Sequence, residues 1–346
     1  MFIRPASASA APARVRQAMA SAAPASTVGP RPRRVLLTND DGPASPFFEP
    51  LVRQVASTLR WDCVVAIPSR EFSFCSKLVS RGPIECARIH DSQLQRALID
   101  AQSEGDPSGG SAPSTCLHGE YHFTASPGTA VNIALHSSIG EECDLVVSGP
   151  NVGHNTGRSS VLSSGTVGAA LESAIAGRRA VAISFPFFDG WNKWTDAQIE
   201  DAVSIAGDVL LELWSNWDAD MADVYNVNIP LGIRDDKADE DARSLIRRTF
   251  IDEATDYESL FKRADTNSAD NTNDGGNGSG EGDAAKSSGD RSIEVYEWGP
   301  RALRAFESRC ITEGSDVWAV RRKLVSVTPL HANLQSLVRP SSPPPV

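Results

Sequence analysis

The sequence lacks any Cys-x-x-Cys pair among its six cysteines, any long apolar run and any excess of positive charge. Without paired cysteines at metal-ligand spacing, no zinc site is expected, and the cysteines are predicted to be free thiols in a reducing compartment. No stretch approaches the ~20 apolar residues that cross a bilayer, so no membrane partner is expected. A net charge of -11 argues against polymeric nucleic acid as a main partner.

Two further motifs are missing, and each removes a class of protein. No Gly-x-Gly-x-x-Gly follows the first predicted strand, which argues against a dinucleotide-dependent oxidoreductase. His118 and His122 are four residues apart, but no glutamate stands where a zinc-protease helix requires one. We therefore predict that this pair lies in a loop and binds no metal.

The first 34 residues contain six arginines, no acidic residue and no apolar core of a secretory signal. This composition predicts a disordered tail over 1–33 of a cytoplasmic protein; a mitochondrial transit peptide is the alternative. Residues 264–292 are almost wholly small and polar, which predicts a disordered insertion. A second disordered tail is predicted over 332–346, which leaves one domain over 34–331.

Within that domain, short apolar runs alternate with stretches of helical periodicity. The alternation predicts an α/β fold in which helices cover a mainly parallel sheet, with a smaller β-rich part at the C-terminal end. Strands are predicted over 35–38, 63–67, 144–148, 180–184 and 224–229, helices over 47–59, 128–138, 165–176 and 195–214, an exposed loop around 101–115, renewed structure at 293–298 and two strand-like pieces within 316–328.

The first predicted strand, residues 35–38, runs directly into Asn39-Asp40-Asp41-Gly42. Two adjacent carboxylates at the end of a buried strand repel each other unless a positive charge lies between them, and a divalent cation is the usual solution. The alternative is an ordinary surface turn, because these residue types dominate turns.

Oxygen-bearing residues also follow two later strands and open a later helix. Ser73 comes shortly after the second strand, and Ser148, Asn151 and Asn155 lie at the end of the third. The carboxyl ends of parallel strands meet at one sheet edge, and an all-oxygen set suits Mg²⁺ or Mn²⁺. The run 163–166, Ser-Ser-Gly-Thr, opens a predicted helix, whose free N–H groups form an anion site. Together these features indicate phosphate-ester hydrolysis.

Each of these features also has an ordinary explanation. Ser163 or Ser164 is a typical helix N-cap. Asn151 and Asn155 suit local hydrogen bonds within a loop. The order of the motifs along the chain, rather than any single residue, favours the functional interpretation.

That order resembles the SurE family of metal-dependent survival-protein nucleotidases and acid phosphatases. The matching runs are Thr38–Gly42, Pro68-x-Arg70-x-x-Ser73, Val147–Gly157 and Ser163–Ala170, with weaker similarity in 226–230, 316–319 and 325–330. The resemblance covers about residues 34–331. It implies a Rossmann-like domain, a C-terminal extension exchanged between subunits, and a homodimer or homotetramer.

The resemblance also implies roles for individual residues. One divalent cation per subunit, Mg²⁺ or Mn²⁺, would be held by Asp40, Asp41, Ser73 and Asn151. The phosphate site would be lined by Asn39, Ser148, Gly149, Asn155, Ser164, Gly165 and Thr166. Two segments depart from the family pattern: Phe74-Cys75-Ser76-Lys77 replaces a run of small residues, and Arg158–Leu162 lacks the acidic residues often present there.

The sequence therefore predicts a divalent-metal-dependent phosphomonoesterase acting on nucleoside monophosphates or similar small phosphate esters. Asp41 and Asn39 are the predicted catalytic residues: Asp41 would orient the attacking water, and Asn39 would hold a ligand side chain or a phosphate oxygen. His154 lies in the same region but is not assigned as the general acid. The alternative is a nucleotide- or metal-binding regulatory protein that has lost catalysis, for which the altered 74–77 segment and Arg158 are the support.

Overall fold

A computed structural model describes residues 31–90, 92–103, 116–235, 241–253, 259–264, 294–298 and 311–333. Its centre is a nine-stranded sheet in the order β3-β4-β2-β1-β5-β6-β7-β11-β8. Neighbouring strands are parallel except at β3–β4 and β7–β11. The strands are β1 (Val35–Thr38), β2 (Cys63–Pro68), β3 (Cys86–Ile89), β4 (Leu117–Phe123), β5 (Leu145–Val152), β6 (Arg179–Phe185), β7 (Val224–Asn228), β8 (Ile246–Arg248) and β11 (Val325–Leu330). The predicted mainly parallel α/β sheet is confirmed.

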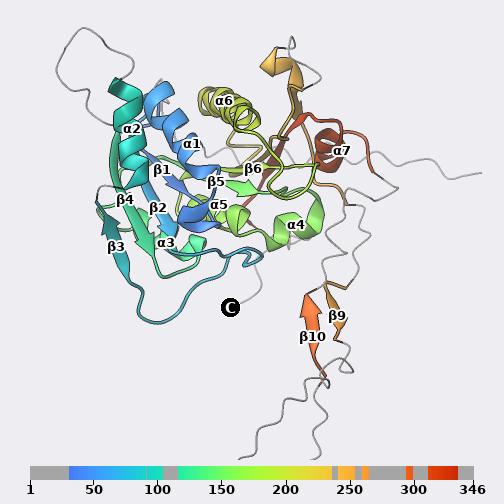
Figure 1. Cartoon of the computed structure of the whole chain (residues 1–346), viewed down its shortest axis with the longest axis horizontal. Coiled ribbons are helices and arrows are strands. Elements are labelled where there is room, and N and C mark those ends of the chain that lie inside the picture. Colours follow the sequence, from blue (N-terminus) through green and yellow to red (C-terminus); the bar gives the residue numbers. More distant parts are fainter. Residues whose placement is uncertain are drawn as a thin grey trace, which may run out of the picture.

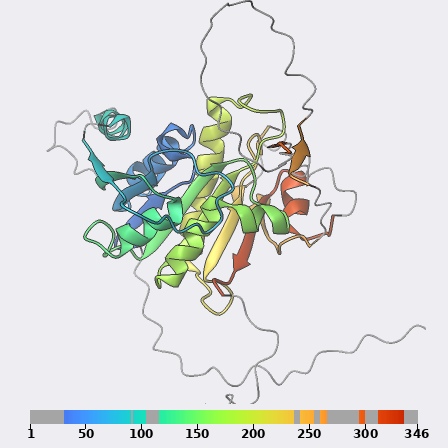
Figure 2. The same cartoon turned by 90° about the horizontal axis from the view of Figure 1, so that it is seen from below.

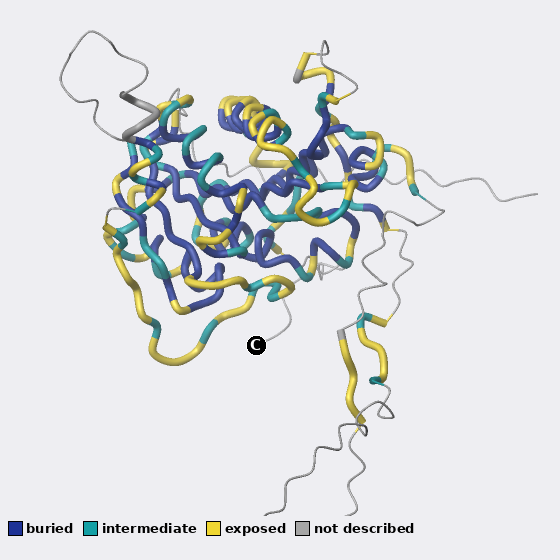
Figure 3. Tube along the Cα trace, viewed as in Figure 1, coloured by how far each residue is buried: buried dark blue, intermediate teal, exposed yellow. Residues whose placement is uncertain are grey.

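Helices cover both faces of the sheet (Figures 1 and 2). The apolar sides of α1 (Phe48–Arg53), α2 (Gln93–Ser103) and α6 (Asp196–Ser215) belong to the core on one face. Those of α3 (Pro127–Leu135) and α5 (Gly165–Ile175) belong to the core on the other. Every residue of β1 and β2 is buried, as expected of strands covered on both faces (Figure 3).

The C-terminal part adds β8 and β11 to the sheet and a separate antiparallel pair, β9 (Phe261–Arg263) with β10 (Tyr296–Trp298). This agrees with the predicted β-rich C-terminal part. Of the 316–328 region, only the second piece is a strand, β11. The first is helix α7 (Asp316–Arg321), contrary to the prediction. Ser315 caps α7 by accepting a hydrogen bond from the Trp318 N–H at 3.2 Å, and this cap outweighs the β-branched composition.

Asp316 links three separate parts of the chain through its buried carboxylate. Its Oδ2 accepts a hydrogen bond from the N–H of Gly157 at 2.8 Å, and its Oδ1 accepts one from the N–H of Asp252 at 2.9 Å. The N–H of Val317 in α7 also donates to Oδ1, at 2.8 Å. Burial nevertheless raises the pKa of Asp316 to about 6. Gly157 opens helix α4 (Gly157–Ser163), so a C-terminal side chain supports the start of this helix.

Other differences from the sequence prediction are local. The predicted loop pair His118 and His122 lies instead in strand β4 near one side of the sheet, where a polar strand is tolerated because it is partly exposed. The predicted helix 47–59 continues beyond α1 as one turn of π-helix, η2 (Gln54–Thr58). Residues 101–103 end α2 rather than beginning a loop.

Several predictions concern segments that are largely outside the described residues. The tails over 1–33 and 332–346 are described only at 31–33 and 332–333, and the insertion over 264–292 only at Ala264. The five cysteines in the described ranges are free thiols. Among the helices of these ranges, none is both long and apolar enough to cross a membrane.

Candidate phosphate and metal site

The polar turns predicted to meet do emerge at one edge of the sheet. Strand β1 lies between β2 and β5, and its last residue, Thr38, is in register with Ser148 of β5. The turn at 39–42 therefore leaves the sheet beside the end of β5. The N–H of Phe72 donates to the carbonyl of Asp40 at 2.7 Å, which brings the segment after β2 to the same place.

Asp40 is almost completely buried, with 2% of its surface exposed. Its Oδ1 accepts a hydrogen bond from Thr166 Oγ1 at 2.6 Å. Burial raises the pKa of Asp40 to about 6, although this hydrogen bond acts in the opposite direction. Thr166 is fully buried, so its hydroxyl fixes the orientation of the Asp40 carboxylate.

Asp41 accepts a hydrogen bond on Oδ2 from the N–H of Val152 at 3.0 Å. Burial, and then the negative charge of Asp40, raise the pKa of Asp41 to about 7. Two adjacent carboxylates are thus held together although each disfavours the charge of the other. A hard divalent cation would relieve this repulsion, and the surrounding hydroxyl and amide oxygens are donors that Mg²⁺ and Mn²⁺ accept. The residues therefore fit the predicted metal.

A pocket of about 170 Å³ lies at this edge, and five of the eleven predicted metal and phosphate residues line it. Three of the four predicted metal ligands, Asp40, Ser73 and Asn151, line it, and Asp41 lines an adjoining pocket together with Ser73. The predicted phosphate residues Asn155 and Ser164 line the small pocket, as do His154, Ser160 and Ser163, which had no assigned role in phosphate binding. The metal- and phosphate-binding roles of the predicted residues stay predictions.

Helix α5 supplies one side of the pocket. Ser164 is its N-cap, and Ser164 Oγ accepts a hydrogen bond from the N–H of Val167 at 3.0 Å. Ser164 therefore acts as the helix N-cap that its residue type suggests. Because its oxygen only accepts in this bond, its hydroxyl proton is left to donate toward the pocket. Gly165 follows with no side chain, and a Cβ built there would lie only 2.7 Å from Asp40 Oδ2.

Strand β5 contains a backbone irregularity between Ser148 and Asn151. The Gly149–Pro150 peptide is cis, and Gly149 has a φ of +120°. A Cβ at Gly149 would lie 2.1 Å from the carbonyl oxygen of Ile183, so only glycine fits. The buried hydroxyl of Ser148 has no hydrogen-bond partner among the described residues. Its predicted contact with phosphate would satisfy it.

The two predicted asparagines have their amides engaged with the protein. Asn39 Nδ2 donates to the carbonyl of Gly42 at 2.9 Å, and the N–H of Gly42 donates back to Asn39 Oδ1 at 3.0 Å. Asn39 thus closes the turn that presents the two aspartates. Asn155 Nδ2 donates to Ser184 Oγ at 2.9 Å. Direct contact of either amide with a ligand stays a prediction.

Sequence reasoning missed the residues that hold the 151–155 loop. Asn226 Nδ2 donates to the carbonyl of Asn155 at 2.7 Å, and Asn228 Oδ1 accepts the Asn155 N–H at 2.8 Å. Asn226 and Asn228 are fully buried in β7. Their alternation within an apolar strand was the signal, because buried amides need partners.

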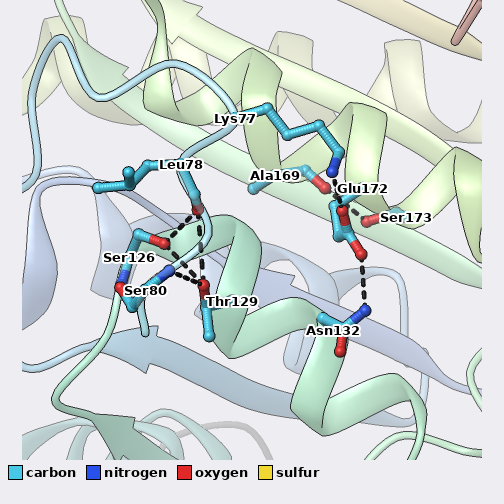
Figure 4. Close-up of polar contacts among 9 residues, drawn as sticks. All are labelled: Lys77, Leu78, Ser80, Ser126, Thr129, Asn132, Ala169, Glu172 and Ser173. Atoms are coloured by element: carbon cyan, nitrogen blue, oxygen red, sulfur yellow. Dashed lines mark hydrogen bonds and ion pairs between the residues drawn. The ribbon is translucent and has the colours of Figure 1, made fainter. Parts of the chain in front are cut away.

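The loop that carries Ser73 is anchored on α3 and α5 (Figure 4). The carbonyl of Leu78 accepts a hydrogen bond from Ser126 Oγ at 2.5 Å, and the N–H of Ser80 donates to Thr129 Oγ1 at 2.8 Å. Lys77 forms an ion pair with Glu172 of α5. Asn132 Nδ2 of α3 donates to the same carboxylate at 2.7 Å.

Replacing Lys77 with Met is expected to destabilise the protein by about 2 kcal/mol, because the mostly buried Glu172 carboxylate loses its cation. The measurement is urea unfolding of the full chain. Adding Glu172→Gln to Lys77→Met should recover much of this loss, since the remaining amide carries no charge. If Lys77→Met alone were as stable as the wild type, the ion pair between Lys77 and Glu172 would not hold the loop.

Comparison with known proteins identifies the chain's relatives. Residues 35–250 match the family model for the survival protein SurE. A probable tubulin–tyrosine ligase, PBY1, from Saccharomyces cerevisiae is 34% identical over 217 residues, which are 57% of this chain but only 29% of that protein. The 5′-nucleotidase SurE of Methanocella arvoryzae is 29% identical over 204 residues, covering 58% of this chain and 67% of that protein.

A longer match is to the 5′-nucleotidase SurE of Herpetosiphon aurantiacus, 29% identical over 305 residues that cover 88% of this chain and 94% of that protein. Among solved structures, the SurE protein from Aquifex aeolicus aligns with a TM-score of 0.56 and 22% identity, covering 87% of this chain and 94% of that one. At this identity the structural match shows the fold, and it agrees with the motif resemblance.

Proposed function

Because this chain belongs to the SurE family, we propose that it is a divalent-metal-dependent phosphomonoesterase acting on nucleoside monophosphates or similar small phosphate esters. The observation that carries the proposal is the pair of adjacent carboxylates, the buried Asp40 and the half-buried Asp41, beside a small pocket lined by hydroxyl groups. Relatives named 5′-nucleotidase support the same reaction class.

Asp40, Asp41, Ser73 and Asn151 would hold the cation, which supplies Lewis-acid polarisation of a phosphate oxygen and lowers the pKa of a nearby water. Thr166 keeps the Asp40 carboxylate in one orientation through its hydrogen bond. Asn39 fixes the turn that presents both aspartates.

The remaining residues act on the phosphate group. The hydroxyl of Ser164 and the free N–H groups at the start of α5 donate to the phosphate oxygens, where negative charge develops during in-line attack. Asp41 orients the attacking water. The buried hydroxyl of Ser148, which has no partner in the part of the chain that the structure describes, donates toward the same group.

Removing the metal is expected to abolish phosphate release. Phosphate would be measured from 5′- and 3′-nucleoside monophosphates and an aryl phosphate, first with EDTA and then with Mg²⁺ or Mn²⁺ restored. Loss to background in EDTA and recovery on adding metal support the proposal, and circular dichroism shows that the EDTA-treated protein stays folded. Full activity in EDTA would contradict the metal's role.

The second candidate is a binding protein without catalysis, favoured by the bulky Phe74 at the edge of the pocket. Nucleotide binding without phosphate release, with any metal and on folded protein, would support it. The homodimer or homotetramer and the cytoplasmic or mitochondrial location stay predictions.

A further inference from the structure

A second, larger pocket adjoins the small one. Its volume is about 720 Å³, within the ~300–1,000 Å³ typical of small-molecule sites. Ser73, Phe74 and Val152 line both pockets, so the two meet along this wall. A phosphate held in the small pocket would therefore direct the rest of the ester into the large one.

Trp191, in the loop between β6 and α6, lines the larger pocket but not the small one. Its ring meets Phe187 and Trp194 edge-on, with centroids 5.9 and 5.8 Å apart. Trp191 is nevertheless 70% exposed. A large aromatic side chain that its neighbours brace but do not cover is typical of a binding surface.

The wall shared by the two pockets includes a second exposed aromatic side chain. Phe74 is 49% exposed and has a φ of +58°, a left-handed conformation that is costly for a bulky residue. Such strain persists where the surrounding structure imposes it, and here the Ser76 N–H, which donates to the carbonyl of Ser163 at 2.9 Å, fixes the loop. The strained backbone thus presents an aromatic ring at the junction of the pockets.

The charge of the larger pocket restricts its occupant. Asp41 and Glu71 line it, and its lining contains no lysine or arginine among the described residues. Glu71 Oε1 already accepts a hydrogen bond from Ser73 Oγ at 2.7 Å, so this carboxylate faces the reaction site. A second phosphate or a carboxylate on the leaving group would be repelled, whereas hydroxyl groups can donate to Glu71.

We propose that this pocket binds the nucleoside part of the substrate, with the base stacked on Trp191 and bounded by Phe74. An uncharged aromatic group that also carries hydroxyls matches the aromatic walls and the acidic lining together. The inference rests on the proposed function for the placement of the phosphate, and it adds that Trp191 determines preference for the leaving group.

The test compares adenosine 5′-monophosphate with ribose 5-phosphate, which has the same phosphate and sugar but no base. In Trp191→Ala, kcat/KM for the nucleotide should fall about ten- to 100-fold, the effect of losing one base–aromatic stack, while the value for ribose 5-phosphate stays unchanged. Trp191→Phe should keep most of the preference. Phe188→Ala is the matched control, because Phe188 is 41% exposed in the same loop but does not line the pocket.

An equal loss on both substrates, or no loss on either, would overturn the inference. Equilibrium dialysis of the same two compounds against the full chain separates it from the proposed function. If no ester is hydrolysed but Trp191→Ala weakens binding of the nucleotide alone, the pocket assignment stands and the phosphatase fails. If hydrolysis occurs and Trp191→Ala leaves nucleotide binding and turnover unchanged, the phosphatase stands and the pocket assignment fails.

Discussion

Replacing Asp41 with Asn is expected to lower phosphate release by about 1,000-fold or more while leaving the fold intact. The amide has the shape of the carboxylate, and its oxygen can still accept the Val152 N–H that now donates to Asp41 at 3.0 Å. The negative charge is lost, however, and with it much of the attraction for a divalent cation. Metal catalysis supplies several kcal/mol, and each 1.36 kcal/mol is a factor of ten in rate.

Stability provides the second measurement for Asp41→Asn. The charge of Asp40 opposes ionisation of Asp41, so removing one of the two charges should not destabilise the metal-free protein. Urea unfolding in EDTA should give a free energy of unfolding at least equal to that of the wild type. Asp220→Asn, an exposed carboxylate outside the site, is the matched control and should keep full activity. Near wild-type turnover in Asp41→Asn would show that the metal assignment is wrong.

Replacing Gly165 with Ala is expected to lower activity by about 100-fold although only one methyl group is added. The new Cβ would lie 2.7 Å from Asp40 Oδ2 and 2.9 Å from both Asp40 Cβ and Cys75 Sγ, so a side chain must move. Asp40 is buried and bonded to Thr166, so the movement displaces the carboxylate from its position. A misplacement of about 1 Å in a reactive site can cost 100-fold in rate.

Gly128→Ala is the matched control for Gly165→Ala, because both glycines are buried in the first turn of a helix. A Cβ at Gly128 would meet its nearest atom, the carbonyl oxygen of Leu78, at 3.6 Å, an ordinary contact. This variant should keep its activity and gain up to about 1 kcal/mol of stability from the better helix propensity of alanine. If Gly165→Ala were equally active, the close approach of Asp40 to α5 would not matter for function.

The strands and helices that position the site were predictable because each carries a strong local pattern. Strand β1 is a short apolar run that stops at Asn39, and α6 begins with a capping box formed by Thr195 and Gln198. The meeting of the 39–42 turn with the end of β5 followed from the geometry of parallel strands. Local pattern plus this one rule therefore recovered the five central strands, β2, β1, β5, β6 and β7, and the location of the candidate site, but not β3, β4 or β8.

Contacts between distant segments were not predictable in the same way. Nothing near Lys77 in the sequence indicates that Glu172 lies beside it. The pattern around Asn226 indicates a buried amide that needs a partner, but it does not identify Asn155 as that partner. The valines of 316–321 favour a strand, but the cap at Ser315 begins helix α7 there instead. These features depend on tertiary packing, which one sequence does not display.

The buried carboxylate of Asp316 limits how far this site could be transplanted as a self-contained module. The segment that matches the family model ends at residue 250 and contains every proposed metal ligand. Yet the start of α4 is held by Asp316, and β11 stands between β7 and β8 in the sheet. A graft of residues 35–250 into another scaffold would contain the proposed metal ligands but not Asp316 or β11. The start of α4 would lose its hydrogen bond to Asp316, so the C-terminal segment has to be transferred together with residues 35–250.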